Sequence, residues 1–246
     1  MKAKIYNLIV LDKSGSMHSI ADLAIGGVNE TIGTIKSDNK QNAENTEQFV
    51  SLYAFCRCDS RYIMQNVPAE EATVIDTKDY MPCCGTPLYD SLGKSLNDLY
   101  NLIKEDKNAT ASVTIITDGY ENSSTEYDHA AIKSLIERLK GEGWLFAYIG
   151  ADHDVESVSI SLSIDHHLKF DKSHKSTSEM FARERSSRSR WSKRISDEFA
   201  LNPCCFRDSL VDINSDDYWA FDTPFDGNKN DSKNEAPQED QSEGKN

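Results

Sequence analysis

The chain has 246 residues, with 41 acidic against 27 basic side chains and a formal net charge of -14. This length is enough to bury a substantial core, whereas the charge disfavours a general nucleic-acid binder or a protein that docks on anionic membranes. The longest apolar run, Ile5–Leu11, is far too short to span a bilayer, so we expect a soluble protein.

The amino terminus is similar to a secretion signal only superficially. Two lysines precede the apolar run, but no small-residue cleavage site follows it and Asp12 ends it at once. We therefore interpret Ile5–Leu11 as the first strand of the fold and expect a cytoplasmic protein.

Short apolar stretches rich in β-branched or aromatic residues recur along the chain. They predict strands over Ile5–Leu11, Phe49–Phe55, Val113–Ile116 and Trp144–Ile149. Runs that are apolar throughout are typical of strands covered on both faces, as in a parallel sheet. Residues Arg61–Val67 are expected to form a hairpin with the strand before them.

Helical patterns lie between these strands. Apolar residues fall on one face over Leu88–Ile103 and again over Ile132–Leu139. Alternating strands and helices call for right-handed crossovers. The predicted fold class is therefore α/β, a three-layer, Rossmann-like, doubly wound and mostly parallel sheet, followed by a C-terminal helical extension. No internal repeat is evident.

The segment Lys172–Leu201 has mostly helical spacing of its large apolar residues, which predicts a last helix docked on the sheet. Basic residues gather over 183–194. We interpret this basic segment as a solvated helix face, with a patch for nucleic acid or an acidic partner as the alternative.

The end of the chain is polar and acidic. Beyond Phe225 there is too little apolar content to offset the entropy of ordering, which predicts disorder. Residues 212–246 hold ten acidic and three basic side chains, half of the net charge of the protein. We predict three parts: a domain over residues 1–170, a helical extension packed on it over 171–211, and an acidic, largely disordered tail over 212–246.

The six cysteines stand in close pairs, at 56/58, 83/84 and 204/205. Neighbours in sequence rarely bridge one another without strain, and free thiols are usual in a reducing compartment. The chain lacks the Cys-x-x-Cys pairs that zinc sites commonly use. We therefore expect structural thiols and no metal cluster, although oxidation at Cys83 and Cys84 could sense or perturb the nearby Thr86.

Oxygen-bearing side chains follow the first strand immediately, at Asp12, Ser14 and Ser16. In an open parallel sheet, loops at the carboxyl ends of strands line the ligand crevice. A carboxylate and two hydroxyls are hard ligands, and Gly15 lets the backbone turn both hydroxyls inward. The pattern taken by itself is also that of an ordinary Asx or Ser turn.

A second such strand end strengthens the case for a site. The strand Val113–Ile116 runs into Thr117, Asp118 and Gly119, so another carboxylate lies at a carboxyl-end turn. Thr86 precedes the helix Leu88–Ile103, where it can cap the helix or act as a ligand. We expect these loops to converge.

Asp-x-Ser-x-Ser, then a Thr after a Gly, then Thr-Asp-Gly, in this order and spacing, resembles the von Willebrand factor A (vWA) domain over residues 1–170. The resemblance implies a metal-ion-dependent adhesion site (MIDAS) formed by Asp12, Ser14, Ser16, Thr86 and Asp118. It further implies that the hydroxyls contact the ion directly or nearly so, and that the carboxylates act largely through water or hydrogen bonds. Residues 148–152, Tyr-Ile-Gly-Ala-Asp, are similar to small stand-alone bacterial vWA proteins of the tellurium-resistance-associated type.

Such a ligand set suits Mg²⁺ or Mn²⁺. Neutral hydroxyls leave the ion much of its charge, so an open coordination position attracts an external carboxylate. We predict a non-enzymatic, divalent-metal-dependent module that binds an Asp or Glu of a protein partner, with neither nucleic acid nor a membrane as partner. The oligomeric state is left open.

Two alternatives remain at this stage. A metal-dependent hydrolase or phosphoryl-transfer enzyme would use the same oxygens but needs a positioned base. His18 and His153 are the candidates, and we interpret both as exposed loop residues, with Asp152–Asp154 as a possible rim. A carboxylate of the acidic tail could also compete for the ion, although we favour a solubilising tail.

Overall fold

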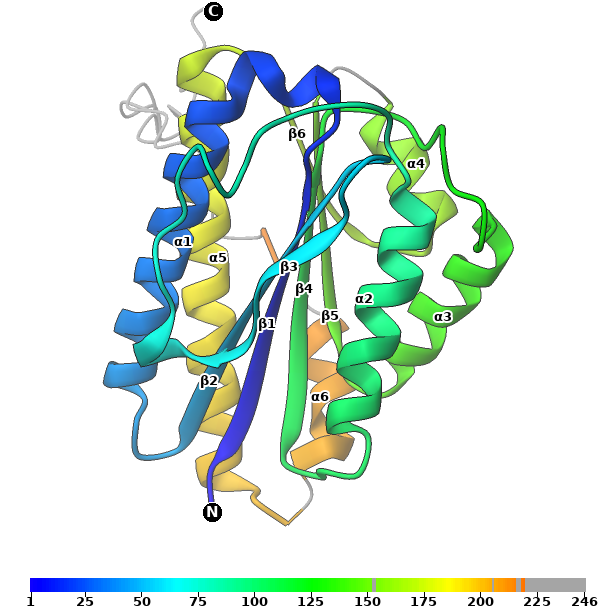
Figure 1. The fold of residues 1–246 in the computed structure, drawn as a ribbon. Coiled ribbons are helices and arrows are strands. Elements are labelled where there is room, and N and C mark those ends of the chain that lie inside the picture. Colours follow the sequence, from blue (N-terminus) through cyan, green and yellow to red (C-terminus); the bar gives the residue numbers. More distant parts are fainter. Residues whose placement is uncertain (152–153, 205, 216–217, 220–246) are drawn as a thin grey trace, which may run out of the picture.

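A computed structural model describes residues 1–151, 154–204, 206–215 and 218–219 of the chain. Its centre is a six-stranded sheet in the order β3-β2-β1-β4-β5-β6 (Figure 1). Strand β3 pairs antiparallel with β2, and every other pair is parallel. The strands are β1 (Ala3–Asp12), β2 (Thr46–Phe55), β3 (Arg61–Pro68), β4 (Ala109–Thr117), β5 (Leu145–Ala151) and β6 (His166–Phe170).

Helices cover both faces of the sheet (Figure 1). One apolar cluster joins the sheet to α1 (Ala21–Gln41), α5 (His174–Leu201) and α6 (Phe206–Ser215). The other joins it to α2 (Leu88–Ile103), α3 (His129–Gly141) and α4 (Val155–Ser161). Two short 3-10 helices, η1 (Gly15–Ile20) and η2 (Ala69–Glu71), complete the described elements.

The alternation of side chains along β1 explains its continuous apolar run. Ile5 and Ile9 lie in the cluster under α1 and α5, whereas Leu8 and Val10 lie in the cluster under α2 and α3. Each face of the strand therefore buries its own set of side chains, as expected for a central parallel strand. The prediction of a three-layer, doubly wound α/β fold is confirmed.

The position of β1 creates the crevice. It pairs with β2 on one side and β4 on the other, so the order of strands reverses between β1 and β4. Ligands in open α/β sheets bind outside the carboxyl ends of the strands at such a point. Leu11 lies beside Ile116 in this register, so the residues that follow β1 and β4 meet there.

Sequence patterns located the central elements but missed others. The predicted strands and the hairpin correspond to β1–β5, and the two predicted helices to α2 and α3. Helix α1 was not predicted, since Gly26, Gly27 and Gly33 interrupt its pattern. Three further elements, α4, β6 and α6, were also missed, and each has at most 10 residues.

The interpretation of the basic segment as a solvated face is wrong for Arg188. This side chain on α5 is 1% exposed and donates to Glu184, to Asn7 on β1 and to Thr114 on β4. A buried charge needs both an opposite charge and hydrogen bonds, and this network supplies them. The guanidinium thus fastens α5 to the middle of the sheet.

The expectation that the cysteines are all free thiols is also wrong. Cys58 and Cys84, 26 residues apart, form a disulfide, while Cys56, Cys83 and Cys204 are free. The loops after β2 and before α2 bring the two partners together, which no spacing within a pair could indicate.

Two further findings concern the ends of the chain and the membrane. Among the described residues, every helix is too short or too polar to cross a bilayer. From residue 220 onward, the predicted acidic tail lies outside the described residues. The predicted boundaries at residues 170 and 211 stay predictions.

Candidate metal centre

Asp12, the last residue of β1, is the most deeply placed member of the predicted site. Its side chain is fully buried, and each carboxylate oxygen accepts one hydrogen bond. Ser14 N donates to Oδ1 at 2.6 Å and Thr117 Oγ1 donates to Oδ2 at 2.7 Å. These bonds join the ends of β1 and β4 and fix the turn that carries both serines.

The two serine hydroxyls form a chain that ends on the second carboxylate. Ser14 Oγ lies 3.1 Å from Ser16 Oγ, which donates to Asp118 Oδ1 at 2.5 Å. Because Ser14 is bonded to Asp12 as described above, four of the five predicted residues belong to one hydrogen-bonded cluster.

Thr86 approaches the same cluster from the loop before α2. A Cβ placed on Gly119 would lie 3.5 Å from Thr86 Oγ1 and 3.6 Å from Ser16 Oγ, so both hydroxyls flank this glycine. The first N–H groups of α2 are capped by Glu121 and Ser124, at 2.9 and 3.0 Å, so the alternative role of Thr86 as a capping residue is not realised. The Thr86 backbone is held by Asn122, whose Oδ1 accepts from its N–H at 2.9 Å.

The electrostatics of the cluster favour a cation. Burial raises the pKa of Asp12 to about 6, although hydrogen bonds from Thr117 and Ser14 oppose the shift, and the nearby charge of Asp118 adds to it. The Asp118 side chain is fully buried, with Lys172 Nζ 2.7 Å from Oδ2 as an ion pair that lacks hydrogen-bond geometry. Two buried carboxylates thus face one partly exposed ammonium.

The residues present fit a small divalent ion. All the side-chain donors are oxygens, and Oδ2 of Asp118 is a buried acceptor without a hydrogen bond. Magnesium takes octahedral oxygen ligands at about 2.0–2.1 Å, which places neighbouring ligands about 3 Å apart. The Ser14 and Ser16 hydroxyls, 3.1 Å apart, match that spacing.

Three contributors to this centre were missed from the sequence. Tyr80 Oη donates to Asp12 O at 2.6 Å, Asn122 holds Thr86, and Lys172 pairs with Asp118. Tyr80 and Lys172 stand in segments with no local motif, so only the fold brings them to the site. Asn122 lies four residues after Asp118, and its place in the loop after β4 was the one available signal.

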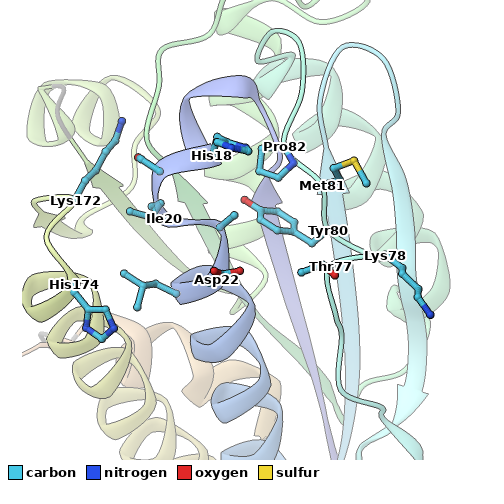
Figure 2. A pocket seen from close by; sticks show the side chains of 13 residues that line it. His18, Ile20, Asp22, Thr77, Lys78, Tyr80, Met81, Pro82, Lys172 and His174 are labelled. Atoms are coloured by element: carbon cyan, nitrogen blue, oxygen red, sulfur yellow. The ribbon is translucent and has the colours of Figure 1, made fainter.

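A pocket of about 730 Å³ adjoins the centre. Figure 2 shows Lys172 and His174 on one wall and Lys78 and Met81 on the other. Lys172 and Tyr80 line the pocket and also contact the acidic cluster, so the two features are continuous. His18 is exposed and lines this pocket, as interpreted, but it lies in the 3-10 helix η1 and not in a loop.

The predicted rim is described only in part. Residues 152 and 153 lie outside the described residues. Asp154 N donates to Tyr120 Oη at 3.2 Å, and the Asp154 side chain caps α4 by accepting from Ser157 N. This segment therefore lies beside the loop that follows β4, on the same edge of the sheet as Asp118.

The comparisons with known proteins give structural likeness without sequence matches. No protein-family model matches the chain, and no curated protein matches it. A von Willebrand factor type A structure from Catenulispora acidiphila is 16% identical with a TM-score of 0.53, and covers 78% of this chain and 43% of its own. The pilus adhesin SpaC from Lactobacillus rhamnosus GG is 14% identical with a TM-score of 0.55, over 77% of this chain and 31% of its own.

A third structure carries a metal. Proximal thread matrix protein 1 from the mussel byssus, with a zinc-occupied MIDAS motif, is 13% identical with a TM-score of 0.50, over 74% of this chain and 44% of its own. The chain thus matches less than half the length of each of these three proteins. At such low identities the likeness establishes the fold, and this protein has the vWA fold.

Proposed function

We propose that this protein is a divalent-metal-dependent protein-binding module, a stand-alone bacterial vWA protein in which Asp12, Ser14, Ser16, Thr86 and Asp118 hold Mg²⁺ or Mn²⁺ as a MIDAS. The observation that carries the proposal is the convergence of these oxygens at the reversal of strand order, with a buried, non-hydrogen-bonded Oδ2 on Asp118. The bound ion would supply positive charge and an open coordination position for a carboxylate.

The residues around the centre support an acidic partner. The adjoining pocket carries two lysines, Lys78 and Lys172, against one carboxylate, Asp22, and Lys172 also pairs with Asp118. Opposite charges at a rim speed encounter and orient a partner. We therefore infer that the partner presents an Asp or Glu to the ion and that neighbouring acidic residues lie along this pocket.

Binding, and not catalysis, is the function we propose. Within the described residues, the hydrogen bonds of the Asp12 and Asp118 carboxylates come from hydroxyls and backbone, and no histidine contacts either. Hydrolysis would require a positioned base at hydrogen-bond distance from a metal-activated water. A relation to tellurium-resistance-associated vWA proteins is part of the proposal and is supported only by residues 148–152.

Thermal unfolding tests the ion site. A ligand that binds the native state stabilises it by about 2.7 kcal/mol at a hundredfold excess over Kd. We expect Mg²⁺ and Mn²⁺ to raise the Tm of the wild type, and Asp118→Asn to abolish the rise. Asp22→Asn, which removes an exposed carboxylate of the adjoining pocket, is the matched control and should respond like the wild type. An equal rise in Asp118→Asn would contradict the proposal.

A second measurement tests the open coordination position. Bound Mn²⁺ enhances the relaxation of water protons, and a carboxylate that displaces water lowers this enhancement. We expect a short glutamate-containing peptide to lower it and the matching glutamine peptide to leave it unchanged. Equal effects of both peptides, or no effect of either at tens of millimolar, would show that the ion does not bind a partner's carboxylate.

A further inference from the structure

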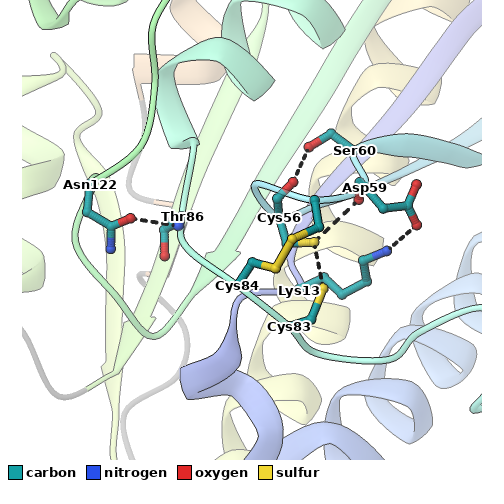
Figure 3. The surroundings of a disulfide bond; sticks show 9 residues. Lys13, Cys56, Asp59, Ser60, Cys83, Cys84, Thr86 and Asn122 are labelled. Atoms are coloured by element: carbon teal, nitrogen blue, oxygen red, sulfur yellow. Dashed lines mark hydrogen bonds and ion pairs between the residues drawn. A yellow bond between two sulfur atoms is a disulfide. The ribbon is translucent and has the colours of Figure 1, made fainter.

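Four cysteines from two separate loops converge beside the proposed ion site. Cys56 and Cys58 follow β2, whereas Cys83 and Cys84 precede α2. Cys58 and Cys84 are joined by a disulfide, and Cys56 Sγ lies 3.1 Å from Cys83 Sγ. The sulfurs of Cys58, Cys83 and Cys84 all lie within 4.8 Å of one another. Figure 3 shows the sulfur atoms pointing into one cluster.

The backbone around this cluster is firmly held. Cys83 N donates to Lys13 O at 2.8 Å, Gly15 N donates to Cys84 O at 3.0 Å, and Arg57 N donates to Gly85 O at 2.9 Å. These bonds join the loops that carry the sulfurs to the loop after β1. Cys84 has φ of 60°, a left-handed conformation that a non-glycine residue keeps only where its surroundings determine it.

A positive charge lies next to the sulfurs. The Lys13 side chain is 4% exposed, and its Nζ contacts Asp59 Oδ2 at 2.7 Å beside Cys56 and Cys83 (Figure 3). Arg61 pairs with the same carboxylate at 3.2 Å. A cluster of four thiolates around a divalent ion carries a net charge of minus two. Lys13 and Arg61 lower the cost of forming it, and the one Asp59 carboxylate between them offsets part of this effect.

We propose that the reduced thiolates of Cys56, Cys58, Cys83 and Cys84 bind one Zn²⁺ in a structural site, of which the Cys58–Cys84 disulfide is the oxidised, metal-free form. Zinc prefers four soft ligands in a tetrahedron at about 2.3 Å, which places the sulfurs about 3.8 Å apart. Cys83 Sγ lies 3.1 Å from Cys56 Sγ and within 4.8 Å of the sulfurs of Cys58 and Cys84, so Cys83 links all four, and side-chain rotation after reduction would bring Cys56 toward the other two. The site differs in residues and chemistry from the proposed MIDAS.

The chemistry of the interconversion balances. A thiol reductant of the glutathione class gives two electrons and two protons, which cleave the Cys58–Cys84 bond to two thiols, while two reductant molecules become one disulfide. Four thiols then lose four protons as four zinc–sulfur bonds form. Hydrogen peroxide reverses this: two thiolates give it two electrons and become the disulfide, the peroxide takes up two protons and becomes two waters, and Zn²⁺ leaves as the other two thiolates are protonated.

The site has a consequence for the loops it joins. Cys84 accepts from Gly15 N, and Thr86 follows two residues later. Zinc would therefore hold the loop of Ser14 and Ser16 together with the loop of Thr86. The sequence did not indicate this site, because Cys-x-Cys and Cys-Cys differ from the common Cys-x-x-Cys spacing and only the fold brings the two pairs together.

Cobalt substitution of the full-length, reduced protein tests the proposal. Tetrahedral thiolate ligation of Co²⁺ gives intense visible bands and near-ultraviolet charge-transfer bands, which oxygen ligands at a MIDAS do not give. We expect one Co²⁺ per chain with these bands, displaced by one Zn²⁺. Serine substitution of Cys56, Cys58, Cys83 or Cys84 should remove them, whereas Cys204→Ser and Asp118→Asn should retain them. Asp118→Asn separates failure here from failure of the proposed MIDAS.

A second experiment measures how far zinc protects the thiols of the wild type from alkylation. It needs no serine variant, so it still tests the proposal if those variants do not fold. Reduced protein is alkylated with and without Zn²⁺ and the labelled sites are mapped by mass spectrometry. We expect zinc to protect the four cluster cysteines and to leave Cys204 reactive. Reduced, folded protein that gives no thiolate–cobalt bands and no zinc protection would overturn the proposal, as would protein in which Cys56 and Cys83 form a second disulfide and reduction restores no metal uptake.

Discussion

Lys172 Nζ lies 2.7 Å from Asp118 Oδ2, so an ammonium from the segment after β6 neutralises a fully buried carboxylate that we assign to the ion site. A divalent ion and this ammonium would compete for the same negative charge. The relationship links the ion site to the adjoining pocket, because Lys172 lines both.

Replacing Lys172 should therefore lower the stability of the metal-free protein and raise its affinity for the metal. In Lys172→Gln the Asp118 charge lacks its partner, so the metal-free Tm should fall. Removal of the repulsion should tighten Mn²⁺ binding on the order of tenfold, because charges a few ångströms apart near a surface interact by a few kcal/mol before screening. Calorimetric titration measures the affinity. Lys169→Gln, an exposed position on β6, is the control and should change neither quantity.

Asp90 should stabilise the loop that carries Asn122, and it should do so only at a pH where its carboxyl group is ionised. Its carboxylate accepts from the backbone N–H groups of Thr125, Glu126 and Tyr127 at 2.7–2.9 Å. Burial acts to raise the pKa of Asp90, but these hydrogen bonds outweigh it and hold the pKa below 3.8.

A carboxyl with a lowered pKa in the folded state contributes stability above its unfolded value and loses it as the pH falls further. Asp90→Asn should therefore cost about 1–2 kcal/mol at pH 7 by urea denaturation. The difference from wild type should shrink as the pH falls below about 3.8, where the unfolded carboxyl takes up a proton, and should vanish at the lower pH where the native carboxyl also protonates. Glu105→Gln, at an exposed position, should cost nothing at either pH. A constant difference across this range would show that the charge of Asp90 is not the cause.

Alanine substitution of two adjacent glycines of α1, Gly26 and Gly27, should change the stability of the protein in opposite directions. A Cβ on Gly27 would lie 2.2 Å from the Phe181 ring of α5, whereas a Cβ on Gly26 would meet nothing within 4 Å. Gly27→Ala should destabilise by about 1–3 kcal/mol through overpacking. Gly26→Ala should stabilise by about 0.5–1 kcal/mol, because alanine loses less entropy in a helix. Equal effects in urea denaturation would contradict the close α1–α5 contact.

Removing one partner of the buried ion pair of α5 should lower the free energy of unfolding strongly, whereas replacing both partners by apolar residues should lower it little. Arg188→Met leaves Glu184, which is 1% exposed, without its counter-charge, and should cost about 3–5 kcal/mol. The double variant Arg188→Met with Glu184→Leu should recover most of this loss, because neither charge is then buried. Lys193→Met, at an exposed position of the same helix, is the control. A double variant no more stable than Arg188→Met would contradict this account of the network.

The sequence determined the elements whose signals are local. Both faces of β1 and β4 are covered, so their side chains are mostly apolar on both faces, and this predicts a buried parallel strand without knowledge of its neighbours. The motifs at Asp12 and Asp118 could be placed at strand ends for the same reason. Convergence of four predicted ligands within one hydrogen-bonded cluster follows from the strand order, and ion binding there stays a prediction.

Tertiary structure decided the contacts between residues that are distant in the chain. Lys172 reaches Asp118, Arg188 reaches Asn7 across 181 residues, and Cys58 bonds to Cys84. Each of these side chains stands in a segment whose local pattern suggests something else: a solvated lysine, a polar helix face, a free thiol. A buried charge or a paired sulfur depends on the partner that packing supplies, and periodicity along the chain carries no information about that partner.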